Sequence, residues 1–231
     1  MNLIKLPFRA FASYAILAII LTLSSRAFAQ VERNLLQKTV DLNQLKNLLV
    51  LDQKWVSYPS YPDRAGWDKL TGIMKVSLIQ KWEGNLHYKW QGIRVSDYLE
   101  YERTGSRQRT EEILNRNSQA LNDLVLAELA EGKGRFMDQI IDGVWFYCEM
   151  TTWVAANHLT AMTKHKPSRP LPISDEVIVD LTVGDMSTFL AWTYYFLKEP
   201  MDNVHPEISI RLRRALQERI LDPYMQRTDY W

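Results

Sequence analysis

The segment from Thr110 to Gly134 places the tightest limit on what this chain can fold into. Its apolar residues recur at a helical period of about 3.6, at Ile113, Leu114, Leu121, Leu124, Val125 and Leu129. Thr110 is a residue type that caps helix starts, and Gly132 and Gly134 are placed to end the helix. We therefore predict one long amphipathic helix between these limits.

Similar segments follow one another along the chain, separated by proline and glycine breakers. We predict helices over residues 34–55, 67–84, 96–105, 138–166, 185–200 and 206–223. Pro200 and Pro223 are expected to end the last two of them, and the β-branched stretch 177–181 could form one short strand. Short connections make neighbouring helices antiparallel hairpins, so the predicted fold class is all-α, built of successive helical hairpins.

The first 29 residues have the pattern of a secretory signal peptide. Lys5 and Arg9 provide a positive start, residues 11–23 are an apolar core, and Ala27 and Ala29 form a small-residue cleavage site. The apolar run is too short to predict a membrane span. We expect cleavage after residue 29, which leaves residues 30–231 as an exported protein, periplasmic or secreted.

Charge and cysteine usage narrow the possible partners. The chain has 28 basic and 27 acidic residues, and the signal segment holds three of the basic ones and no acidic one, so 25 and 27 remain. This near balance gives no reason to predict nucleic-acid binding. Cys148 is the one cysteine, which excludes an internal disulfide and favours a buried small hydrophobe. The four histidines are spread too widely to predict a metal site, and we predict no cofactor: His87, His158, His165 and His205.

The stretch from Gly143 to His158 crowds reactive and aromatic residue types into sixteen positions. If residues 138–166 form one straight helix, Trp145, Glu149 and Trp153 share one face and His158 lies on the other. Such a helix is apolar almost all round, which predicts burial. Glu149 and His158 are then either substrate contacts or satisfied structural groups, and the tryptophans are either core residues or platforms for sugar rings.

A run of arginines near the C-terminus leaves two interpretations open. Arg211, Arg213, Arg214 and Arg219 lie within nine residues of a predicted helix. Arginine forms bidentate contacts with carboxylates, so the run either meets an acidic polymer or forms a solvated helix face.

Four segments of the chain resemble the bacterial heparinase II/III-like polysaccharide lyases, namely residues 97–107, 124–158, 189–197 and 205–231. The second contains a "CE…W…H" pattern made by Cys148, Glu149, Trp153 and His158. The resemblance implies an incomplete (α/α) toroid of helical hairpins. It also implies β-elimination on a uronic-acid-containing polysaccharide, and Glu149, Trp153 and His158 as substrate-binding residues. Trp145 is added to this predicted set because it shares the helix face of Glu149 and Trp153.

Family members are several hundred residues long, so the resemblance implies that residues 30–231 match the N-terminal part of the toroid domain. The catalytic Asn, His and Tyr of the family mostly follow that part, and no residue of this chain is assigned a catalytic role. Two alternatives stay open. One is a helical-toroid glycoside hydrolase, which requires two carboxylates flanking the scissile bond, and the other is a non-catalytic carbohydrate-binding or scaffold protein.

Overall fold

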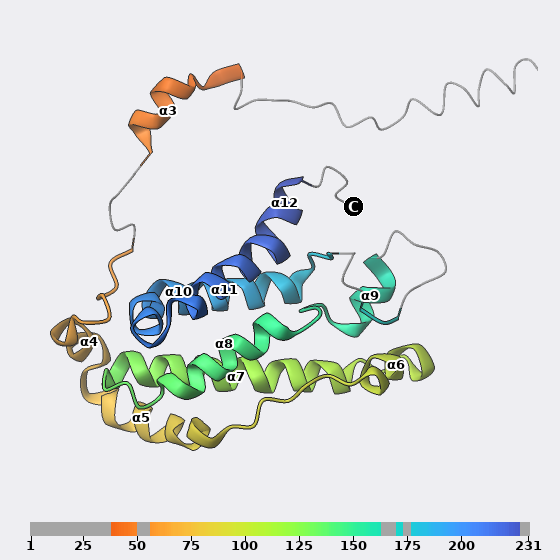
Figure 1. Ribbon diagram of the computed structural model, residues 1–231, viewed down its shortest axis with the longest axis horizontal. Coiled ribbons are helices and arrows are strands. Elements are labelled where there is room, and N and C mark those ends of the chain that lie inside the picture. Colours follow the sequence, from red (N-terminus) through yellow and green to blue (C-terminus); the bar gives the residue numbers. More distant parts are fainter. Residues whose placement is uncertain (1–37, 50–55, 163–169, 173–176, 227–231) are drawn as a thin grey trace, which may run out of the picture. The chain divides into compact units, whose positions relative to one another are not determined.

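A computed structural model describes residues 38–49, 56–162, 170–172 and 177–226 (Figure 1). The chain divides into two compact units, Met1–Val56 and Ser57–Trp231. The described residues are helical and contain no strand, which confirms the all-α class. None of the helices in these ranges is long and apolar enough to cross a membrane.

In the first unit, the helix predicted over residues 34–55 is wrong in its extent. Its described portion is interrupted at Val40 and Asp41, and helix α3 then covers only Leu42–Leu48. Asp41 starts this helix because its carboxylate accepts a hydrogen bond from the Asn43 N–H at 2.9 Å. Residues 34–37 and 50–55 lie outside the described residues.

The second unit begins with short helical elements. They are α4 (Arg64–Thr71), η1 (Gly72–Met74), α5 (Lys75–Trp82), η2 (Glu83–His87) and α6 (Val95–Thr104). The single helix predicted over residues 67–84 is divided at Gly72, whose φ of 52° lies in the left-handed region that glycine adopts without strain. α6 ends at Gly105 as predicted, again with a positive φ.

Helices α7 (Gln108–Glu131) and α8 (Met137–Glu149) pack together as a hairpin, with Gly132 ending α7 as predicted. The predicted cap at Thr110 is wrong. α7 begins one turn earlier, and the Thr110 hydroxyl donates to the Arg107 carbonyl at 3.0 Å inside the first turn. The side chain is fully buried there, so it is a satisfied polar residue of the core.

The long helix predicted over residues 138–166 is also wrong, because α8 ends at Glu149. Met150 takes an extended conformation, and a separate helix, α9, covers Ala156–Met162. The Arg219 guanidinium donates to the carbonyls of Cys148 (3.2 Å) and Met150. A helix end whose free carbonyls are satisfied in this way needs no further turn.

The last elements are α10 (Leu181–Val204), α11 (Pro206–Leu216), the π turn η3 (Gln217–Leu221) and α12 (Asp222–Gln226). Residues 177–180 form no strand, and the Asp180 carboxylate caps α10 by accepting from the Val183 N–H at 2.7 Å. Neither predicted proline stop occurs. Pro200 lies inside α10, where it removes one intrahelical hydrogen bond near the C-terminal end, and Pro223 lies within the unbroken helical run of α11, η3 and α12. α10 and α11 pack as the predicted hairpin.

The core lies among α7, α8, α10 and α11. Fully buried side chains from these four helices include Leu121, Leu124, Ile140, Tyr147, Leu190, Leu197 and Leu212. One charged group lies inside this region: the Glu128 carboxylate accepts from the Tyr61 hydroxyl (2.7 Å), the Gly134 N–H (2.8 Å) and the Phe136 N–H (3.2 Å). Closure of the helices into a toroid stays a prediction.

Candidate functional site

Three of the four residues predicted from the sequence, Trp145, Glu149 and Trp153, lie near the end of α8, but not as one buried face. The Trp145 side chain is 41% exposed, and the Arg211 guanidinium lies over its ring at 4.7 Å from the ring centre. Glu149 is exposed as well and forms an ion pair with Arg211. The predicted burial of this helix face is therefore wrong at Trp145 and Glu149.

Trp153 lies in the loop after α8 and is only 1% exposed. Its indole N–H donates to the Tyr147 carbonyl at 2.9 Å, and the Arg219 guanidinium covers its ring at 5.0 Å. Burial of Arg219 lowers the pKa of its guanidinium. Burial of Cys148 beside it raises the pKa of that thiol to about 11, which keeps it protonated and unreactive, as predicted for a buried small hydrophobe.

A hollow of about 420 Å³ lies next to these residues. We call it the α8-end hollow, and its charged lining residues are Glu149, Arg211, Glu218 and Arg219. Two arginines face two glutamates. Glu149 is paired with Arg211, Glu218 accepts from Arg214 at 2.7 Å, and Arg219 is held by carbonyls. The charges of this hollow are largely satisfied within the protein.

His158 is separated from the other predicted residues. Its Nδ1 forms a hydrogen bond with the Asp180 carboxylate, whose side chain is 1% exposed. Because the other oxygen of Asp180 caps α10, His158 connects α9 to the start of α10. The structure thus gives both Trp153 and His158 a structural partner, while the assignment of the four residues as substrate-binding stays a prediction.

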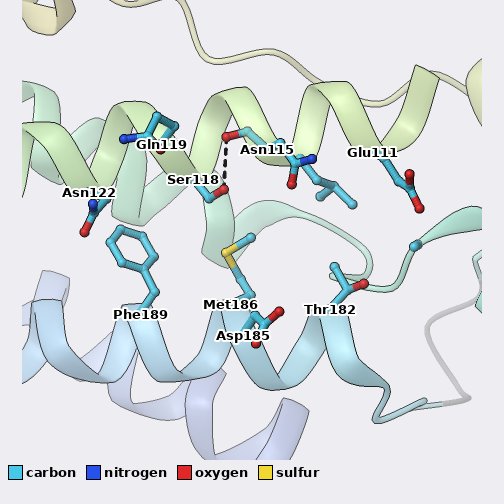
Figure 2. Close-up of a pocket in the computed structure, with 11 residues that line it drawn as sticks. Glu111, Asn115, Ser118, Gln119, Asn122, Thr182, Asp185, Met186 and Phe189 are labelled. Carbon is cyan, nitrogen blue, oxygen red and sulfur yellow. Dashed lines mark hydrogen bonds between the residues drawn. The ribbon is translucent and has the colours of Figure 1, made fainter. Parts of the chain in front are cut away.

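A second hollow, which the sequence did not predict, lies between α7 and α10 (Figure 2). Its volume is about 460 Å³. We call it the α7–α10 groove. Its floor is apolar and buried, and its rims are polar, with these lining residues: Glu111, Leu114, Asn115, Ser118, Gln119, Asn122, Ala155, Thr182, Asp185, Met186 and Phe189.

The α7 rim presents amides and hydroxyls toward the groove. Its polar residues stand at i, i+4, i+7, i+8 and i+11 from Glu111, a spacing that places them on one helix face. The Asn115 and Asn122 side chains form no hydrogen bond with another described residue, so their amide donors and acceptors are available to a ligand. Gln119 is partly used, because its amide donates to Asp123 at 2.7 Å.

The α10 rim combines a carboxylate with an aromatic ring. Asp185 is exposed and has no ion pair within the described ranges. Phe189 is half-buried, and its ring points from α10 toward Asn122 (Figure 2). One and two turns further along α10, the rings of Trp192 and Phe196 stack at 5.4 Å between centres.

This aromatic side of α10 ends in a cluster that is partly open to solvent. The Tyr58 ring packs edge-on against Trp192 (5.9 Å) and Phe196 (5.7 Å), and Tyr58 and Tyr195 are 44% and 39% exposed. Flat rings of this kind pack against the C–H faces of other ring systems. The cluster thus places further flat rings along α10 beyond Phe189.

Sequence reasoning missed this groove because its residue types are individually ordinary. One signal was present: the stretch 115–122 places uncharged amides and a hydroxyl on the exposed face of α7, where solvated helix faces usually carry Lys and Glu. The second half of the groove comes from α10, more than sixty residues later, and no local pattern connects the two helices.

No family model matches the chain, and no curated protein matches it significantly. Within the described ranges, no group of three or more His, Cys, Asp or Glu side chains is placed to hold a metal ion.

Proposed function

We propose that this protein binds a saccharide chain in the α7–α10 groove, as an exported protein of the heparinase II/III-like polysaccharide lyase class that acts by β-elimination on a uronate-containing polymer. One observation carries the binding proposal: the Phe189 ring points toward the Asn122 amide across an open groove that Asn115 also lines, and neither amide has a partner among the described residues (Figure 2). The four resembling segments and the signal-like N-terminus support the wider class.

A pyranose ring has a C–H face that packs on aromatic rings and an edge of hydroxyls that need hydrogen-bond partners. Sites for such ligands hold a few polar groups fixed against an apolar surface. Asn amides both donate and accept hydrogen bonds, and the Asp185 carboxylate accepts from hydroxyls. The apolar floor of Leu114 and Met186 excludes water beneath a bound ring and strengthens these hydrogen bonds.

The binding proposal is tested by calorimetric titration of the full chain with maltotriose, N-acetylchitotriose and trigalacturonate. At least one trisaccharide is expected to bind, and Phe189→Ala is expected to weaken that binding about tenfold, because the stacking face is lost. Trp145→Ala is the comparison variant, because this exposed aromatic residue lies outside the groove and belongs to the alternative site predicted at the end of α8. Unchanged affinity of the Phe189 variant would remove the groove from the proposal, and a loss at Trp145 instead would favour that alternative site.

The lyase part is tested separately with uronate polymers. β-Elimination produces an unsaturated uronate that absorbs ultraviolet light, whereas hydrolysis produces new reducing ends without that absorbance. New reducing ends alone would replace the lyase with a glycoside hydrolase. Binding without any turnover would favour a carbohydrate-binding role for this chain.

A further inference from the structure

We propose that the α7–α10 groove accepts an uncharged sugar unit, either neutral or N-acetylated, and rejects a uronate. This inference rests on the proposed saccharide binding and names the class of unit that the groove selects. In a uronate-containing polymer, the unit in this groove is then one that carries no carboxylate.

The charges of the groove carry this inference. Two carboxylates line it, one from each rim: Glu111 on α7 and Asp185 on α10. Both lie toward the Thr182 end of the groove, while Asn122 and Phe189 lie toward the other end (Figure 2). No Lys or Arg is among the described residues that line the groove.

The two carboxylates differ in whether a described basic side chain forms an ion pair with them. Glu111 is paired with Arg107 at 3.1 Å, and the carboxylate remains on the groove wall. Asp185 has no ion pair within the described ranges. A bound uronate would thus place its own carboxylate beside Asp185, which has no described ion-pair partner, and like charges at close range disfavour binding.

An uncharged sugar unit has no carboxylate and is therefore not repelled by the carboxylates of the groove. Sugar hydroxyls and an acetamido N–H donate to carboxylates, and such charge-assisted hydrogen bonds are stronger than neutral ones. The amides of Asn115 and Asn122 then match the remaining hydroxyl and carbonyl groups. The α8-end hollow differs in its lining, because it contains two arginines, Arg211 and Arg219, beside two glutamates, whereas both described charged residues of the groove are acidic.

The test compares N-acetylchitotriose, maltotriose and trigalacturonate on the full chain by calorimetric titration at low ionic strength. The better of the two uncharged trisaccharides is expected to bind at least about tenfold more tightly than the uronate trisaccharide. The double variant Glu111→Gln, Asp185→Asn is expected to reduce this preference about tenfold, by strengthening uronate binding. Asp142→Asn, an exposed carboxylate on α8 outside the groove, is the matched control and should leave the preference unchanged.

The outcomes separate the inference from the function on which it rests. Binding of all three trisaccharides with equal affinity, or a preference that the double variant leaves unchanged, overturns the inference and leaves saccharide binding in place. Tighter binding of trigalacturonate overturns the inference in the same way. Absence of binding by every trisaccharide overturns both.

Discussion

The α8-end hollow and the α7–α10 groove both collect polar and aromatic side chains, but they differ in what those side chains already bind. At the end of α8, Arg211 is occupied by Glu149 and by the Trp145 ring, and Arg219 is occupied by two backbone carbonyls. In the groove, Asn115 and Asn122 face open space without a described partner. The groups crowded at the end of α8 are satisfied by arginines from α11 and η3, whereas ordinary amides spaced along α7 are left for a ligand.

The largest expected effect is on the free energy of unfolding, and it tests whether Trp153, after the end of α8, stabilises the fold. Replacing Trp153 with Ala removes a 1% exposed indole and its hydrogen bond to the Tyr147 carbonyl. We expect the free energy of unfolding to fall by about 3–5 kcal/mol, as for large buried aromatics elsewhere. Urea denaturation followed by circular dichroism measures this. Trp145→Ala, at the exposed end of the same cluster, should cost under about 1 kcal/mol; equal losses at both positions would contradict the distinction between them.

The second expected effect is a loss of stability on replacing Arg219, whose guanidinium satisfies the carbonyls at the end of α8. Arg219→Ala leaves the carbonyls of Cys148 and Met150 without their donor. We expect a loss of about 2–3 kcal/mol in unfolding free energy, because hydrogen bonds from charged donors to buried acceptors are the costly ones to remove. Arg213→Ala is the control, because that side chain is exposed and changes of this kind stay within about 0.5 kcal/mol. A stable Arg219 variant would show that α8 ends for another reason.

A third comparison contrasts a buried carboxylate with one in the groove. The hydrogen bond from the Arg94 side chain holds the pKa of Asp97 below its usual value. Its ionised form therefore stabilises the fold above pH ~4, and this contribution is lost as pH falls through the lowered pKa.

We expect Asp97→Asn to cost about 1 kcal/mol near pH 7, in part through the Arg94 N–H that Asp97 accepts at 2.9 Å. The stability of this variant should then decrease less than that of the wild type between pH 6 and pH 2. Asp185→Asn, at an exposed position, should change the unfolding free energy near pH 7 by no more than about 0.5 kcal/mol. Denaturation at a series of pH values measures the Asp97 effect, and identical curves for the wild type and the Asp97 variant would rule out the role given to Asp97.

The smallest expected effect is the loss of trisaccharide affinity when one amide of the α7–α10 groove is removed. Asn115→Ala and Asn122→Ala are each expected to weaken trisaccharide binding about fivefold, the value of one neutral hydrogen bond. Neither should change the midpoint of thermal unfolding, because neither amide has a partner among the described residues. A drop in the unfolding midpoint would place these amides with the structural groups at the end of α8 and remove the contrast between the two regions.

Local features of the fold were predictable, and distant ones were not. α7 could be predicted because its apolar residues recur at a helical spacing and Gly132, which ends the helix, follows it directly. The end of α8 was not, because the arginine that satisfies its carbonyls follows about seventy residues later. Pro200 was assigned a stop that the packing of α10 overrides. The groove likewise requires two helices to meet, so neither half of it could be identified alone.

The buried carboxylate of Glu128 has a consequence for how the molecule opens. It accepts hydrogen bonds from Tyr61 and from the N–H groups of Gly134 and Phe136, which belong to separate segments of the chain. Releasing one segment leaves a buried charge with fewer partners, so the segments gain by separating together rather than singly. We therefore expect them to open as one cooperative unit, with the Gly134 amide exchanging with deuterium at the slow rate of that joint opening although this residue is exposed.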